Sequence, residues 1–161
     1  MIAETGHFAL ILALCLALLQ GTLPLAGAAR GHEAWMKLAT GAALAQAAMT
    51  MIAFAALTLA YIHSDFSLRN VFENSHSLKP MLYKVTGVWG NHEGSLVLWV
   101  LILALFALAV ALRGGLPLET KARVLGVLGL IAAGFLAFSL FTSNPFERLD
   151  PPPVDGRDLN P

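Results

Sequence analysis

The sequence has little charge and a single cysteine. Only 12% of its 161 residues are Asp, Glu, Lys or Arg, 57% are hydrophobic, and the formal net charge is zero. So little charge excludes an ordinary soluble domain, and the lack of a basic excess argues against nucleic acid as a partner. The lone Cys15 excludes an intrachain disulfide and a CxxC redox pair. Its place within an apolar run favours a small buried side chain.

Four long runs of the sequence contain no Asp, Glu, Lys or Arg at all. A helix needs roughly 17 to 25 mostly apolar residues to cross a hydrocarbon core of about 30 Å, and in lipid its backbone must pair with itself. We therefore predict an all-α membrane protein with four transmembrane helices. The predicted spans are residues 8–29, 38–62, 95–112 and 124–142. In the second span, small residues such as Gly41 and Ala43 are expected to allow close approach of a neighbouring helix.

Basic residues predict how the chain is oriented in the membrane. The cations of the connectors 30–37 and 113–123 are crowded close to helix ends, whereas those of the opposite set are spread over longer segments. Cations in short loops favour the cytoplasmic side. We therefore expect both termini outside, on the periplasmic side of a bacterial inner membrane. The same side then carries an outer loop, 63–94, and an outer tail, 143–161.

Any chemistry is expected in these outer segments, because no charged residue lies within a span. Long ordered loops usually carry a function. Three of the five histidines, His63, His76 and His92, lie in the outer loop. Histidine nitrogens bind haem iron and other metals, but this spacing matches no metal-ligand pattern. Both interpretations remain open: a ligand, or a loop histidine hydrogen-bonded to backbone.

The outer loop ends in a run that combines aromatic, amide, imidazole and carboxylate groups. The run is Trp89, Gly90, Asn91, His92, Glu93, Gly94 and Ser95. Ser95 is placed to be the N-cap of the third span, and Glu93 would favour the positive end of that helix. Gly90 and Gly94 predict a sharp turn or a close approach of backbone. Capping does not explain why Trp89, Asn91 and His92 occur together.

This run resembles the WGxHEGS motif of the CcmF family of cytochrome c-type biogenesis proteins. Other segments resemble the family in the same order. They are Glu4 and Gly6, then Asp65, Phe66, Ser67, Asn74 and Ser75, then Phe141 to Phe146, and finally Gly156 to Pro161. The resemblance covers the whole chain. The family continues into a tryptophan-rich WWD segment and haem-ligating histidines that this sequence does not contain. The chain is therefore interpreted as the N-terminal transmembrane part of a longer protein, with haem ligands expected beyond Pro161 and no catalytic or metal-binding residue identified.

The resemblance implies a membrane subunit of the haem lyase that delivers haem to apocytochrome c and attaches it. It implies haem for the full-length protein, with none tightly held by this chain, which is not expected to be catalytic alone. The implied partners are membrane lipid, a CcmE-type haem chaperone, a CcmH-type apocytochrome-binding protein and apocytochrome c.

Three other interpretations are open. A sibling haem lyase dedicated to nitrite reductase would look similar over these residues. A small transporter or respiratory-complex subunit would also have four helices, but usually with a buried charge or a broken helix pair, which the sequence lacks. A purely structural membrane subunit is the third.

Overall fold

A computed structural model describes residues 1–159. The last two residues of the Gly156 to Pro161 motif, Asn160 and Pro161, lie outside the described residues. Within residues 1–159 the protein is helical, with no β-strand and one isolated bridge between Leu68 and Arg148. The helices are α1 (Ile2–Arg30), α2 (Glu33–Ile62), α3 (Arg69–Asn74), α4 (Met81–Gly87), α5 (His92–Leu112) and α6 (Leu118–Phe141).

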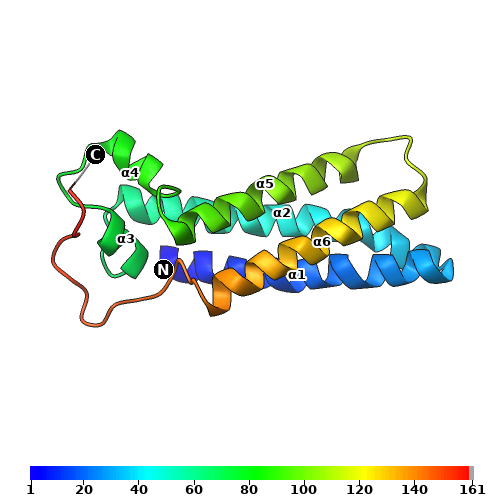
Figure 1. Cartoon of the computed structure of the whole chain (residues 1–161), viewed down its shortest axis with the longest axis horizontal. Helices are drawn as coiled ribbons and strands as arrows, with labels where there is room; N and C mark the ends of the chain where they lie inside the picture. The colour runs from blue at the N-terminus through cyan, green and yellow to red at the C-terminus, as the bar shows by residue number, and fades with distance from the viewer. Residues whose placement is uncertain (160–161) are drawn as a thin grey trace.

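Four helices, α1, α2, α5 and α6, are long and apolar enough to cross a membrane. They run lengthwise side by side (Figure 1). Helices α2 and α6 touch each other, and each also packs on both α1 and α5, so α1 and α5 lie on opposite sides of that central pair. The helices extend beyond the predicted spans at most ends. The C-terminal ends of α2 and α5 coincide with the predicted limits, at Ile62 and Leu112, and α6 ends at Phe141, one residue before its predicted limit.

Glycines bring α1 and α6 into close contact. A Cβ on Gly129 would lie 2.8 Å from the backbone nitrogen of Gly21, closer than packed atoms allow. The expectation for α2 holds only in part. Ala43 is fully buried, but Gly41 is exposed and faces open space. Cys15 is exposed as well, on the outside of the bundle, so the prediction of a buried cysteine is wrong.

Two glutamines lie inside the bundle, at positions that sequence patterns do not mark. Gln20 and Gln46 are both fully buried, and Nε2 of Gln20 donates a hydrogen bond of 2.7 Å to the carbonyl of Leu125 on α6. Burying a polar group in an apolar interior costs free energy, and a hydrogen bond offsets part of that cost. The Gln20 bond therefore ties α1 to α6 in the same region as the glycine contact.

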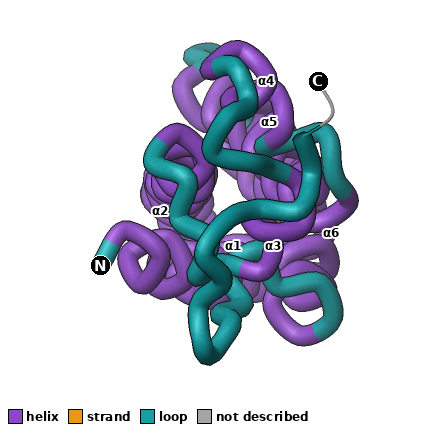
Figure 2. The backbone as a smooth tube through the Cα atoms, turned by 90° about the vertical axis from the view of Figure 1, so that its left-hand side faces the viewer, coloured by secondary structure: helices purple, strands orange, loops and turns teal. Residues whose placement is uncertain are grey.

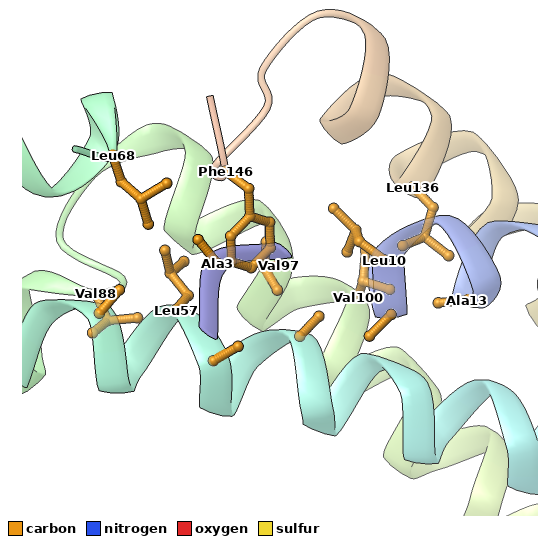
Figure 3. Close-up of a cluster of buried hydrophobic side chains, with 14 of the residues drawn as sticks. Ala3, Leu10, Ala13, Leu57, Leu68, Val88, Val97, Val100, Leu136 and Phe146 are labelled. Carbon is orange, nitrogen blue, oxygen red and sulfur yellow. The ribbon is translucent and has the colours of Figure 1, made fainter. Parts of the chain in front are cut away.

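One hydrophobic cluster joins the four long helices to the outer tail. Leu10, Leu57, Val97 and Leu136 each come from a different long helix and are fully buried. Phe146, which follows α6, inserts its ring among them (Figure 3). The tail is therefore anchored in the core of the bundle.

The two ends of the bundle differ sharply. At one end α1 and α2 are joined through Gly31, whose φ of 69° suits glycine, and α5 and α6 are joined by residues 113–117. At the other end residues 63–91 and 142–159 fold together into a structure we call the polar cap (Figures 1 and 2). The predicted outer loop therefore contains two short helices, α3 and α4.

Candidate functional site in the polar cap

Asn91 is the N-cap residue of α5. Its Oδ1 accepts a hydrogen bond of 2.8 Å from the backbone N–H of Gly94. The prediction that Ser95 caps this helix is wrong, because α5 begins at His92 and Ser95 lies in its first turn. The Ser95 hydroxyl instead donates to the carbonyl of His92 at 2.9 Å. Glu93 remains close to the positive end of the helix, as expected.

Asn91 also closes a ring of polar side chains. Its Nδ2 donates to the hydroxyl of Tyr61 at 2.9 Å, and its Oδ1 accepts from Nδ2 of Asn70 at 2.8 Å. The Tyr61 hydroxyl donates in turn to Oδ1 of Asn70 at 2.7 Å. The remaining amide hydrogens go to the carbonyl of Gly87 and to a Glu93 carboxylate oxygen. Every member is satisfied, so the ring holds α2, α3 and α5 in a fixed relation.

Gly94 allows the backbone to turn into α5. A Cβ at this position would overlap the carbonyl oxygen of Val88. The prediction of close backbone approach is confirmed here. Gly90 shows the other predicted feature, a bend of the backbone, whereas a Cβ there would lie at an ordinary 3.5 Å from the Thr86 carbonyl oxygen. Only one of the two motif glycines is therefore required by close packing.

Trp89 and His92 are the exposed rings of the motif. Trp89 stacks on Phe54 of α2 with ring centroids 6.4 Å apart, and 40% of the Trp89 surface is exposed. Nδ1 of His92 lies 2.9 Å from the hydroxyl oxygen of Ser143, and its ring meets Phe138 of α6 edge-on at 6.1 Å. The motif thus divides into residues that build the cap and two rings at its surface.

Asp65 and Ser67, from the segment after α2 that resembles the family, lie beside the tail and α1. The Ser67 hydroxyl donates to Asp65 at 2.5 Å, and the Ser67 carbonyl accepts from the N–H of Leu149 at 2.8 Å. Arg148 donates to the Ser67 hydroxyl and forms an ion pair with Glu4 near the start of α1. The start of α1, the segment around Ser67 and the tail at Arg148 are therefore in contact, and each resembles a family motif or adjoins one.

Phe146 fits against Gly6. The Phe146 ring is buried, and a Cβ on Gly6 would overlap it. His7 stacks on the same ring with centroids 6.3 Å apart, and its Nε2 lies 3.5 Å from Nδ2 of Asn144. The first turns of α1 and the segment after α6 therefore form one unit, which gives the glycine at position 6 a steric reason.

Asn74 and Ser75 receive the last described part of the tail. The Asn74 side chain donates to a carbonyl one turn earlier in α3 at 2.8 Å. The carbonyl of the buried Ser75 accepts from the N–H of Asp158 at 3.3 Å, and a Cβ on Gly156 would overlap that carbonyl oxygen. Phe66 is buried beside the same glycine. Gly156 is thus the residue that lets the tail approach the loop.

Charged groups fasten the edge of the cap. The hydroxyl and the N–H of Ser77 donate to Asp155 at 2.6 and 2.9 Å, and these bonds lower the pKa of that carboxyl to about 2. Glu73 and Glu147 both pair with Arg69, at 3.1 and 3.3 Å, and raise its pKa. These exposed pairs position the tail and contribute little stability by themselves.

The three histidines of the outer loop lie in separate surroundings. His63 is exposed just after α2, and Nδ1 of His76 accepts from the N–H of Leu78 at 3.2 Å. His92 contacts Ser143. Across residues 1–159 no group of three or more His, Cys, Asp or Glu side chains is arranged to hold a metal ion.

Sequence reasoning missed Tyr61 and Asn70, which complete the ring with Asn91. Tyr61 closes a predicted span, where an aromatic residue is ordinarily an interfacial anchor, and Asn70 lies in a polar loop. No local pattern links residues that are 21 or more positions from Asn91. The sequence offers only a weaker indication. A tyrosine such as Tyr61 at the end of an apolar run needs a hydrogen-bond partner for its hydroxyl when it is buried.

Four membrane-length helices beneath a polar cap define a polytopic α-helical membrane protein. No family model matches the chain. Over its full length it is 65% identical to the cytochrome c-type biogenesis protein Ccl1 of Rhodobacter capsulatus and 55% identical to the cytochrome c-type biogenesis protein CcmF of Pseudomonas aeruginosa. A solved structure of the cytochrome c heme lyase CcmF matches with a TM-score of 0.85 at 28% identity, covering 91% of this chain and 25% of that one. The chain belongs to the CcmF family.

This membership confirms the resemblance found in the sequence. The chain spans about a quarter of the length of the curated relatives it matches, 25% in each of these two cases. The interpretations as a small transporter or a respiratory-complex subunit have no support among these relatives.

Proposed function

We propose that this chain is part of the membrane haem lyase of cytochrome c maturation, which delivers haem and attaches it to apocytochrome c. The observation that carries the proposal is the meeting of distant motif segments in one polar cap, in a chain of this family. Relatives at 44% to 65% identity carry the names CcmF, CycK and Ccl1. For that reason we assign the chain to general maturation and not to the nitrite-reductase sibling.

The cap faces the periplasm of a bacterial inner membrane in this proposal. Arg30 and Lys37 lie at one short connector of the opposite end, and Arg113, Lys121 and Arg123 lie at the other. Cations beside helix ends favour the cytoplasmic side. The orientation then places the motif on the side where haem meets the thiols of the apocytochrome.

The chain contributes a platform in this function, and none of its described residues is assigned a catalytic role. The ring of Tyr61, Asn70 and Asn91 keeps α5 in place against α2. Trp89 and His92 are left at the surface for a partner. We propose the CcmE-type haem chaperone, the CcmH-type apocytochrome-binding protein and apocytochrome c as the candidates for that partner, with haem as the cargo.

Replacing Trp89, His92 and Glu93 together by Ala tests this function in the longer protein that carries the chain. We expect c-type cytochromes to lose most of their covalently bound haem, measured by haem staining, while the amount of the variant protein in the membrane is unchanged. A matched control replaces Leu112 and Val124 by Ala, because both are exposed near the opposite end of the bundle. This control should leave cytochrome c assembly normal. Normal cytochrome c assembly in the triple variant would refute a functional role for the motif.

A further inference from the structure

Helix α4 presents an apolar face on the outside of the polar cap. Four apolar or aromatic side chains in its first turn, or just before it, have 76%, 54%, 68% and 40% of their surfaces exposed, namely those of Leu78, Met81, Leu82 and Tyr83. Burial of apolar surface is favourable in proportion to its area, so a group of exposed apolar side chains marks a surface that contacts a membrane or a partner.

The charged side chains of the same segment are turned inward. Residues 78–90 contain two charged residues, Lys79 and Lys84, and both are buried. Nζ of Lys79 donates to Asp158 at 3.0 Å, and Nζ of Lys84 donates to the hydroxyl of Ser64 at 2.6 Å. A helix at a water-exposed surface ordinarily has the reverse arrangement, with polar residues outward and apolar residues inward. The exposed face of α4 is therefore suited to apolar surroundings.

Helix α4 leads into a segment that lies beside the last turns of a membrane-length helix. A Cβ on Gly87 would lie 3.4 Å from the ring of Tyr61, and Trp89 stacks on Phe54, about two turns before the end of α2. Met51, one turn further along, is exposed on the outside of α2. Figure 1 shows α4 level with the end of α2, and the end-on view places α4 at the edge of the molecule (Figure 2). The apolar face of α4 therefore continues the outer surface of a span.

We propose that α4 is an interfacial helix, which inserts Leu78, Met81 and Leu82 into the boundary between lipid headgroups and acyl chains at the cap end of the bundle. Lipid is the occupant because the face adjoins a membrane span and has no charged side chain. Tyr83 suits the same layer, since aromatic rings with a polar end gather where membrane meets water. The inserted helix holds the polar cap at the membrane surface. The inference applies to either orientation of the chain, so it does not rest on the proposed function.

The buried lysines make this contact independent of lipid charge. Interfacial helices commonly combine burial of an apolar face with attraction between their cations and anionic lipids. In α4 the cations Lys79 and Lys84 are bonded within the cap, so insertion depends on the apolar side chains. We expect residue 82 to lie at the same depth in phosphatidylcholine bilayers with and without phosphatidylglycerol. Insertion only in the presence of phosphatidylglycerol would overturn the proposed apolar contact.

Spin labelling of the full chain in phosphatidylcholine nanodiscs measures the depth directly. Cys15 is first replaced by Ser, because it is exposed and would also take the label. Oxygen concentrates in lipid and a nickel chelate stays in water, so the ratio of their collision rates with the label reports insertion. We expect this ratio to be several times higher for Leu82→Cys than for Val154→Cys. Val154 is the matched control, because it is an apolar residue of the cap with 99% of its surface exposed, in the tail.

Two results of this measurement would overturn the inference. A label at residue 82 that is as accessible to the nickel chelate as the label at residue 154 would show that α4 lies in water. A label shielded from both reagents would show that protein covers this face. Leu78→Cys repeats the measurement at a second position of the face, and it should give the same high ratio as Leu82→Cys.

Discussion

At Asn91 a single side chain caps α5 and joins that helix to two others. The sequence placed the cap four residues too late, because Ser and Asn have similar preferences for the N-cap position. What decides between them is not local. The Tyr61 hydroxyl and the Asn70 amide reach Asn91 and leave Ser95 without such partners. The close approach at Gly94 was predictable, because a glycine beside a helix start commonly marks a place where only a residue without a Cβ fits.

We expect Asn91→Ala to destabilise the protein by about 1 to 3 kcal/mol, the combined cost of a lost cap and of buried polar partners left unsatisfied. Ser95→Ala, at the position that the sequence alone favours, should cost less than about 0.5 kcal/mol. Thermal unfolding in detergent followed by circular dichroism would measure both variants. Equal destabilisation would show that the ring around Asn91 contributes nothing.

Among the helices, the four long ones were predictable and the two short ones were not. A run of apolar residues must be helical in lipid, so composition alone identifies α1, α2, α5 and α6. Helices α3 and α4 have only 6 and 7 residues, too few to be stable by themselves. Their stability comes from tertiary contacts, such as the bond between Asn70 and Asn91, that no local sequence window contains.

The contact between α1 and α6 should be sensitive to the size of one side chain. Gly129→Leu would force the two backbones apart near Gly21, and we expect the protein to be destabilised by about 1 to 3 kcal/mol. Gly134→Leu is the control on the same helix, because a Cβ at Gly134 has open space around it. Denaturant unfolding of the two variants in the same detergent would test this. Similar midpoints would contradict the assigned contact.

The attachment of the tail at Ser77 should depend on pH. The pKa of Asp155 is lowered from 3.8 to about 2 by the hydrogen bonds from Ser77, so the contact favours the ionised carboxyl. Its stabilising effect is complete above about pH 4 and is lost as the pH falls through about 2. We expect protection against amide hydrogen exchange in residues 150–158, corrected for the intrinsic rate, to decline only below about pH 4. Asp155→Asn should remove that dependence.

For the molecule as a whole, the sequence located the motifs but not the way they assemble. The Glu4 and Arg148 ion pair joins the first turn of α1 to the tail, and Phe146 inserts beside Gly6. These contacts form because the four long helices run up and down the bundle, so that the start of α1 and the segment after α6 lie at the same end. Residue patterns identify each segment, but only the packing of the bundle brings them together.

The orientation of the whole protein is tested by reporter fusions. Alkaline phosphatase is active only outside the cytoplasm, so a fusion after Val154 in the tail should be active. A fusion at Gly114, in the connector at the opposite end, should be inactive, because cations flank that connector. A green fluorescent reporter that folds only in the cytoplasm should give the reverse pattern. Activity in the opposite order would invert the proposed topology.

The connector between α5 and α6 has a practical consequence for imaging. Gly114 and Gly115 face open space, and Lys121 already closes the end of α5 by donating to the carbonyls of Ala111 and Arg113 at 3.1 and 2.8 Å. A rigid soluble domain inserted between the two glycines would leave those bonds intact. It would give a small bundle the mass and asymmetric outline that particle alignment in electron microscopy needs, at the end of the molecule farthest from Asn91.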